Sequence, residues 1–235
     1  MRQALITGCY RSGTTILGEM LGKHSAVFCT NELGAFSVGS GLLSRQLQNK
    51  YREGNEYGLP APCRFTTDDF LDVVEWHSPK PWYIDKHPLY LSALPHAAQY
   101  VEKIICVLRH PLEVIESMLK NWTPGADPIA LPWVFERAED CIKPPNRLPS
   151  WYDLMSRWEA WKGSPACPFL EVHYSELGNS AKRIAAFLDI DEDELERIFS
   201  TSFNHRAFPL PSVQLPAEWI DLVDRLGIKS SDSSR

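Results

Sequence analysis

The sequence of 235 residues predicts an α/β fold with three layers, in which helices flank both faces of a central parallel β-sheet. Short apolar runs alternate along the chain with segments that have helical periodicity. The apolar runs are continuous, as in strands that are buried on both faces of a parallel sheet. A chain of this length can form one sizeable core, and we expect a single domain over residues 1–228 and a flexible tail over residues 229–235.

The strands are predicted where β-branched and aromatic residues are enriched in a short apolar run. They are residues 4–7, 27–29, 82–84, 104–108 and 169–172. The predicted helices are residues 12–23, 67–76, 111–121, 151–162, 179–188, 191–199 and 216–226. Residues 37–66 and 122–149 have no clear period. Long irregular segments in a compact domain often cover a binding site, so we expect irregular substrate-covering loops there.

Composition and charge argue against several classes of function. The formal net charge of −6 disfavours a nucleic-acid-binding protein, because such domains usually carry a basic surface. No run approaches the ~20 apolar residues of a membrane helix, and the sequence opens on a strand rather than a signal peptide. We therefore expect a cytoplasmic protein without a nucleic-acid or membrane partner. The six cysteines form no Cys/His cluster of zinc spacing, so we expect no metal site.

The first predicted strand is followed by a turn with the spacing of a P-loop, G-x-x-x-x-G-x-S/T, from Gly8 to Thr15. Such a turn aims backbone N–H groups at one point at the positive end of a helix dipole. Thr14 stands where nucleotide-hydrolysing P-loops have a lysine. Further donors come from Arg11, Ser12, Thr14 and Thr15. The turn predicts a phosphate site rather than a glycine turn with a simple helix cap.

A second motif follows the strand at residues 104–108. The strand ends at Arg109, where nucleotide-hydrolysing P-loop proteins commonly have an aspartate that serves Mg²⁺. Pro111 suits a first helical turn, and Ser117 lies two turns on, on the side of the helix that faces Arg109. The motif favours a second anion over a metal, and the alternative is an exposed arginine and serine on a solvated face.

These two motifs together resemble the sulfotransferase superfamily. The resemblance implies that 3′-phosphoadenosine 5′-phosphosulfate (PAPS) is the sulfuryl donor and 3′,5′-ADP the product. In that family an R/K-S-G-T-T loop binds the 5′-phosphosulfate, and this chain has Arg11-Ser12-Gly13-Thr14-Thr15. A strand-end arginine and a serine eight residues later bind the 3′-phosphate, as Arg109 and Ser117 would here. The resemblance implies a three-layer fold of the P-loop type.

A third segment resembles the Y-E-D-L segment of the family, whose tyrosine lies near the adenine. Tyr174 and Leu177 match it, whereas Ser175 and Glu176 replace its acidic pair. The C-terminal R-K-G loop that often closes the 3′-phosphate site is absent from this sequence. We expect either that His205-Arg206 or Lys229 takes its place or that the 3′-phosphate site is more open.

Two further matches point to the branch that includes the tyrosylprotein sulfotransferases and bacterial stand-alone enzymes. Glu32 stands where that branch has its general base, and Lys86 lies in a segment like its D-K-x-P, whose lysine reaches the reacting phosphosulfate. Both follow predicted strands, so both would project from the same sheet edge as the P-loop. His87 is a rival base. Glu32 as an acid near a helix start, and Lys86 as a surface partner of Asp85, are the alternatives.

The resemblance implies a reaction that needs no metal. Glu32 would take the proton of an acceptor hydroxyl, and Lys86, Arg11, Thr14 and the loop N–H groups would stabilise the leaving 5′-phosphate. We expect a small-molecule or glycan acceptor, such as a phenol or a sugar, and the sequence indicates no oligomeric state. A Mg²⁺-dependent P-loop small-molecule kinase, with Asp85 as the metal ligand, is the alternative function. A nucleotide-binding module without catalysis is the third possibility.

Overall fold

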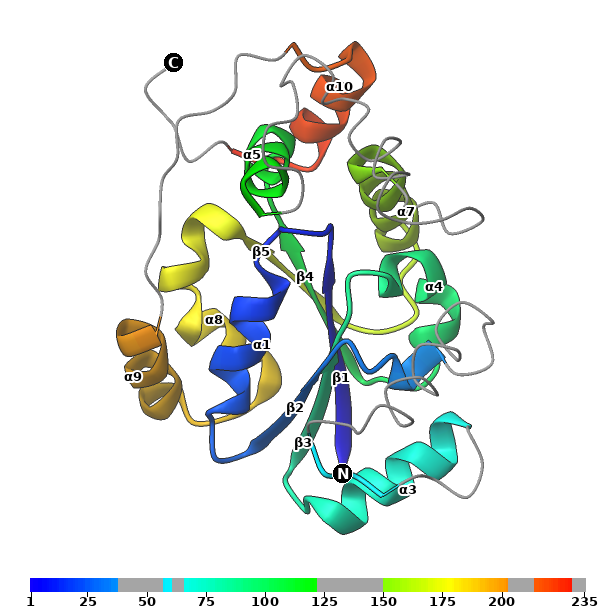
Figure 1. Ribbon diagram of the computed structural model, residues 1–235, viewed down its shortest axis with the longest axis vertical. Helices are drawn as coiled ribbons and strands as arrows, with labels where there is room; N and C mark the ends of the chain where they lie inside the picture. Colours follow the sequence, from blue (N-terminus) through cyan, green and yellow to red (C-terminus); the bar gives the residue numbers. More distant parts are fainter. Residues whose placement is uncertain (38–56, 61–65, 122–149, 203–213, 230–235) are drawn as a thin grey trace.

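The computed structural model describes residues 1–37, 57–60, 66–121, 150–202 and 214–229 (Figure 1). Its central sheet has five parallel strands in the order β2-β3-β1-β4-β5. The strands are β1 (Arg2–Gly8), β2 (Val27–Asn31), β3 (Trp82–Lys86), β4 (Lys103–Leu108) and β5 (Phe169–His173). The predicted α/β fold is confirmed, and each predicted strand is present with one to three further residues.

Helices cover both faces of this sheet (Figure 1). Alternate side chains of β1 enter opposite cores, with Leu5 in one and Ala4 and Ile6 in the other. One face is covered by α1 (Thr14–Gly22), α8 (Ala181–Leu188) and α9 (Glu192–Ser202). The other is covered by α3 (Thr67–His77), α4 (Tyr90–Ala97), α5 (Pro111–Asn121), α7 (Trp151–Lys162) and α10 (Ala217–Arg225). Burial on both faces is why the strand sequences are continuously apolar.

The strand register brings the sequence motifs to one edge of the sheet. β1 lies between β3 and β4, and Ile6 of β1 pairs with both Lys86 of β3 and Ile105 of β4. Asn31, the last residue of β2, also pairs with Lys86. Because all the strands are parallel, the segments that follow them leave the sheet at the same edge.

Several boundaries differ from the prediction. The helix α1 begins at Thr14, not at residue 12, because Gly13 adopts a left-handed conformation with φ of 100°. The predicted helix 179–188 is α8, preceded by a 3₁₀ helix η4 (Tyr174–Asn179). The helix α4 was not predicted, and it is short, contains Pro95 and has a non-helical residue at Ala93.

Other sequence predictions fall outside the described residues. These are the irregular loop over 122–149, most of the loop over 37–66, the site of His205-Arg206, and the tail beyond Lys229. Just before the irregular segment 37–66, a short 3₁₀ helix η1 (Ala35–Ser37) follows β2. Among the helices that the structure describes, none has the length and apolar character needed to cross a membrane.

Candidate active site

The loop from Gly8 to Gly13 packs tightly between β4 and η4. A Cβ atom at Gly8 would lie 2.5 Å from the carbonyl oxygen of Val107, and one at Gly13 would lie 2.5 Å from Cδ2 of Tyr174. Gly8 and Gly13 have φ of 152° and 100°, and Arg11 between them has φ of 59°. A non-glycine residue in this region costs about 1–3 kcal/mol and is held only where its surroundings fix it. The loop is therefore a rigid feature of the site.

The start of α1 presents unused hydrogen-bonding capacity. Its N-cap residue is Gly13, and within the described residues the first turn has neither a side-chain cap nor an acidic residue. The Oγ atom of Ser12 is buried and has no hydrogen-bond partner in the part of the chain that the structure describes. A buried hydroxyl without a partner is costly, and exposed N–H groups at a helix start attract anions. Both observations favour an anion at the loop.

Arg109 joins the three motifs found in the sequence. Its side chain is only 7% exposed, which excludes the alternative of a solvated arginine. Its Nη1 atom donates to the carbonyl oxygen of Arg11 at 2.7 Å, and its Nε atom donates to Glu113 Oε2 at 3.2 Å. Its Cζ atom lies 3.9 Å from the ring centroid of Tyr174, in a cation–π contact. Trp151 Nε1 donates to the carbonyl oxygen of Arg109 at 3.1 Å.

A second guanidinium stands beside the first. Arg11 Nε donates to Ser117 Oγ at 3.1 Å, so the P-loop contacts the helix α5. The pKa of Arg11 is lowered, first by burial and then by repulsion from Arg109. Two neighbouring cations that are partly desolvated gain stability when an anion binds between them. The arrangement therefore favours a phosphate near Arg11, Arg109 and Ser117.

A buried lysine and a half-exposed carboxylate form the other end of the site. Lys86, only 1% exposed, donates through Nζ to Glu32 Oε1 at 2.7 Å and to Thr15 Oγ1 at 3.0 Å. Glu32 has φ of 58°, and its N–H donates to the carbonyl oxygen of Lys86 at 2.5 Å. The partner of Lys86 is thus Glu32, and the surface pair with Asp85 is not formed. The pair connects β3, the residue after β2, and the start of α1.

Asp85 is fully buried and is surrounded by protein donors. Its carboxylate accepts hydrogen bonds from the side chains of Thr30 and Tyr90 and from the N–H groups of Leu33, Gly34 and Ala35. Burial raises the pKa of Asp85, and the hydrogen bonds from Tyr90, Thr30, Ala35 and Gly34 oppose the shift. Oxygens that are already engaged by five donors leave no room for Mg²⁺, which disfavours the kinase alternative. No group of three His, Cys, Asp or Glu residues within the described ranges is arranged to hold a metal ion.

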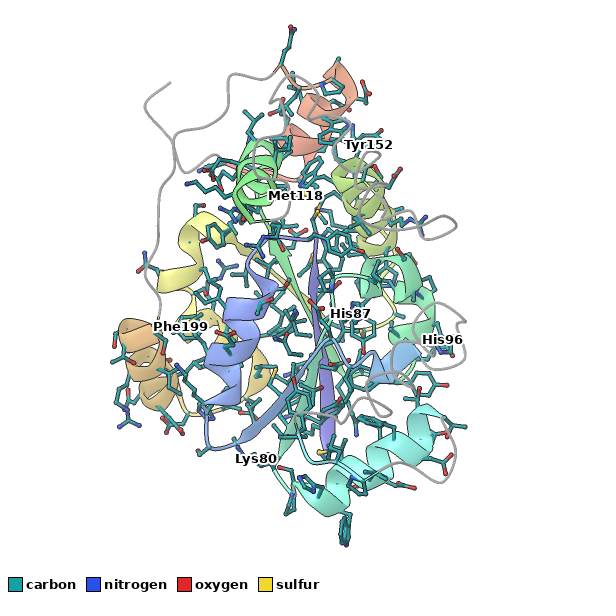
Figure 2. The ribbon with its side chains drawn as sticks, viewed as in Figure 1. Lys80, His87, His96, Met118, Tyr152 and Phe199 are labelled. Atoms are coloured by element: carbon teal, nitrogen blue, oxygen red, sulfur yellow. The ribbon has the colours of Figure 1, made fainter. Side chains whose placement is uncertain are left out.

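The two histidines near the motifs support turns. The Nδ1 atom of His87 accepts from the N–H of Leu89 at 3.1 Å, and its ring packs edge-on against Tyr90. Figure 2 shows His87 beside β1, on the side of α4. The Nδ1 atom of His110 accepts from the N–H of Leu112 at 3.3 Å, and burial lowers the pKa of His110. These bonds give both rings a local structural role, which favours Glu32 over His87 as the base.

Residues 4–194 match the profile of the Sulfotransferase family, a range that contains every motif residue described above. The chain belongs to this sulfotransferase family. A search of curated protein sequences finds no significant match. Membership confirms the expected enzyme class, a PAPS-dependent sulfotransferase that catalyses sulfuryl transfer.

One solved structure supports the fold, and two others are similar to the chain with lower TM-scores. Sulfotransferase STF9 from Mycobacterium avium is 13% identical with a TM-score of 0.60, and the match covers 98% of this chain and 78% of STF9. Mouse sulfotransferase SULT7A1, solved in complex with PAP, is 19% identical with a TM-score of 0.49, covering 86% of this chain and 64% of that one. Sulfotransferase STF1 from Mycobacterium tuberculosis H37Rv is 17% identical with a TM-score of 0.48, and the match covers 85% of this chain and 71% of STF1. The likeness to STF9 shows that the sulfotransferase has the fold of such enzymes.

The residues of the site fit the donor PAPS. This nucleotide carries two separate anionic groups. The sulfotransferase offers the Ser12 hydroxyl, which has no hydrogen-bond partner among the described residues, together with the start of α1, two adjacent guanidiniums and the buried Lys86. The sequence did not indicate that Glu113, Trp151 and Tyr90 hydrogen-bond residues at this site. The i,i+4 spacing of Arg109, just before α5, and Glu113 in its first turn could have indicated the first. Trp151 binds Arg109 from 42 residues away, and Tyr90 binds Asp85 from the unpredicted helix α4, so neither residue has a local helical spacing that would indicate its role.

Replacing Gly13 with alanine is expected to weaken donor binding and lower Tm. The new Cβ would meet the ring of Tyr174 at 2.5 Å, and φ of 100° adds backbone strain of about 1–3 kcal/mol. Calorimetric binding of 3′,5′-ADP and thermal unfolding measure the two effects. The control is Gly163→Ala at the end of α7, where φ is −65° and the nearest atom is 3.5 Å away, so neither quantity should fall. Full donor affinity in the Gly13 variant would contradict this account of the loop.

Proposed function

We propose that the donor binds across the two cationic groups of the site. Arg109 and Ser117 would hold the 3′-phosphate, and Tyr174 would lie near the adenine. Arg11, Ser12, Gly13, Thr14 and Thr15 would bind the 5′-phosphosulfate. The contacts of Arg109 with Arg11 and Tyr174, and of Arg11 with Ser117, support this division because they bring the three motifs into one site.

The observation that carries the proposed chemistry is the ion pair between Glu32 and Lys86. The side chain of Glu32 is 48% exposed, so an acceptor can reach it, whereas Lys86 is buried and contacts Thr15 of the P-loop. A general base must lie close to the acceptor and a charge stabiliser close to the leaving group. The ion pair supports these two roles, because it brings a carboxylate and a cation together at the carboxyl edge of the sheet.

Each residue of the site has its own role in the proposed sulfuryl transfer. The donor supplies the sulfuryl group when it is bound. Glu32 accepts the proton of the attacking hydroxyl at a carboxylate oxygen. Lys86, Arg11, Thr14 and the N–H groups of the loop stabilise the negative charge that grows on the 5′-phosphate oxygen. Because these groups are fixed before the reaction, little reorganisation is needed when the charge develops.

We propose a hydroxyl of a small molecule or a glycan, such as a phenol or a sugar, as the acceptor. The net charge of −6 disfavours a highly anionic polysaccharide, since like charges repel. We also propose a single domain over residues 1–228, in agreement with a family match from residue 4 to residue 194. We propose a cytoplasmic location as well. The buried cysteines Cys9 and Cys106 are free thiols, and thiols are kept reduced in the cytosol.

Calorimetry with 3′,5′-ADP and with ATP plus Mg²⁺ tests this assignment. We expect metal-independent binding of 3′,5′-ADP that Arg109→Ala weakens by about 10–100-fold, since a charged hydrogen bond to phosphate contributes about 1.5–3 kcal/mol. Arg2→Ala is the control, because Arg2 begins β1 at the opposite edge and pairs with Glu102. Thermal unfolding must show that the Arg109 variant is folded, as Glu113 loses its partner in it. A preference for Mg-ATP with no effect of Arg109→Ala would overturn the proposal in favour of a kinase.

A further inference from the structure

The carboxylate of Asp85 makes a set of hydrogen bonds that the donor site does not use. One oxygen accepts from Thr30 Oγ1 at 2.8 Å and from the N–H of Leu33 at 3.3 Å. The other accepts from the N–H groups of Gly34 at 2.7 Å and Ala35 at 3.1 Å, and from the Tyr90 hydroxyl. The side chain is completely buried, so its task lies within the protein.

These bonds hold the chain on both sides of Glu32. Thr30 precedes Glu32 by two residues, and the three N–H groups belong to the residues that follow it directly. Lys86, the neighbour of Asp85 on β3, accepts the N–H of Glu32 through its carbonyl oxygen. The backbone of Glu32 is left-handed, with φ of 58°, a conformation that a glutamate adopts only when its surroundings impose it.

We propose that Asp85 is a positioning residue that orients Glu32 toward Lys86 by fixing the backbone of residues 33–35. This inference rests on the proposed role of Glu32 as the base. Asp85 itself does not touch the reacting groups. It acts through the turn that follows β2, and the turn sets the direction in which the Glu32 carboxylate points.

The chemistry of the site explains why a carboxylate stands at this position. Both of its oxygens face donors, and a carboxylate is an acceptor at both. Asparagine has nearly the same shape, but it has an NH₂ group in place of one of the two carboxylate oxygens. That NH₂ group is a donor, and it would face the N–H or O–H donors of the protein. The substitution Asp85→Asn therefore removes the bonds of one oxygen and leaves buried donors without partners, with little change in volume.

Hydrogen exchange of the unliganded protein gives a readout that is independent of activity. The amides of Leu33, Gly34 and Ala35 are expected to be protected in the wild type and to lose protection in Asp85→Asn. The amides of β1 and β4 should stay protected in both proteins. A loss of protection across the whole sheet, or no change at residues 33–35, would overturn the positioning role.

A double-mutant cycle tests whether the effect passes through Glu32. With PAPS as donor, we would follow formation of 3′,5′-ADP with 4-nitrophenol as the probe acceptor and with water alone. Asp85→Asn is expected to lower kcat by about 10–100-fold, since small misplacements of a reacting group cost this much, with the Kd for 3′,5′-ADP changed less than about twofold. In the Glu32→Ala background the same substitution should have no further effect. An equal loss in both backgrounds would show a general structural role and overturn the inference.

Failure of the base assignment gives a different result, because Glu32→Ala alone would then leave kcat unchanged. If Asp85→Asn does not fold, Tyr90→Phe and Thr30→Val each remove one neutral donor and keep the carboxylate. In the wild-type background, each of these substitutions should lower kcat by a smaller factor than Asp85→Asn does. In the Glu32→Ala background, neither should change kcat. Leu188→Ala in α8, buried in the opposite core, is the control that lowers stability without changing kcat.

Discussion

Replacing Glu32 with alanine is expected to lower kcat for sulfuryl transfer by about 10²–10⁴-fold, the usual contribution of a positioned base. The Kd for 3′,5′-ADP should stay unchanged or fall. Lys86 loses the carboxylate at 2.7 Å but keeps its contact with Thr15, so the buried ammonium becomes more available to an anion. The separation of turnover from donor affinity follows from the position of Glu32, which is nearly half exposed while its partner is buried.

Initial rates of 3′,5′-ADP formation from PAPS and calorimetric titration with 3′,5′-ADP measure the two quantities. Glu196→Ala on α9 is the control, because this exposed carboxylate pairs with Lys182 away from the site. A Glu32 variant that loses donor binding and retains turnover would show that Glu32 binds the donor instead. In that case His87 would again be the candidate base.

Replacing Lys86 with methionine is expected to impair binding and turnover together. Methionine fills nearly the same buried space but has no charge, so the leaving phosphate loses a stabilising cation. We expect kcat to fall by about 10²–10³-fold, as for the loss of one fixed electrostatic donor. The Kd for 3′,5′-ADP should rise by about 10–100-fold, in line with the loss of a charged hydrogen bond.

The same rate and titration measurements apply to this variant, with Lys182→Met on α8 as the matched control. Lys182 is 64% exposed and pairs with Glu192, so its substitution should leave both quantities near the wild-type values. If Lys86→Met lowered stability but not kcat, the lysine would be a structural partner of Glu32. The variants Glu32→Ala and Lys86→Met therefore distinguish a group that accepts a proton from one that stabilises charge.

Much of the fold was predictable because burial on both faces leaves a continuous apolar run in each strand. The strand after residue 26 was predicted to stop at residue 29 because Thr30 and Asn31 are polar, although Thr30 is buried beside Asp85. The helix α4 escaped prediction because Pro95 lies within it and Ala93 breaks its helical geometry. Its stability comes from packing, with Tyr90, Leu91 and Leu94 buried in the core, and packing has no signature in a short sequence window.

The sequence predicted which residues gather at the site better than it predicted how they pair. Lys86 could be placed at a strand end by its motif, but its partner, Glu32, lies 54 residues earlier. Asp85 could be interpreted as a metal ligand or a surface charge, because its donors are mainly backbone N–H groups, which every residue type except proline has. The pairing of β2 with β3 sets Thr30 beside Asp85, and the N–H groups of the residues that follow β2 then reach its carboxylate.

The strand order also bears on how the protein folds. The first strand of the chain is the middle strand of the sheet, with Arg2 beside Trp82 and Ala4 beside Lys103. Long stretches of chain must be ordered before such contacts form, which makes assembly slow. Arg11 reaches its neighbour Arg109 only after β4 has docked against β1. A nucleotide bound at Arg11 and Arg109, as proposed, would therefore find its binding residues together only at the end of folding, so it would slow unfolding of the folded protein without speeding its formation.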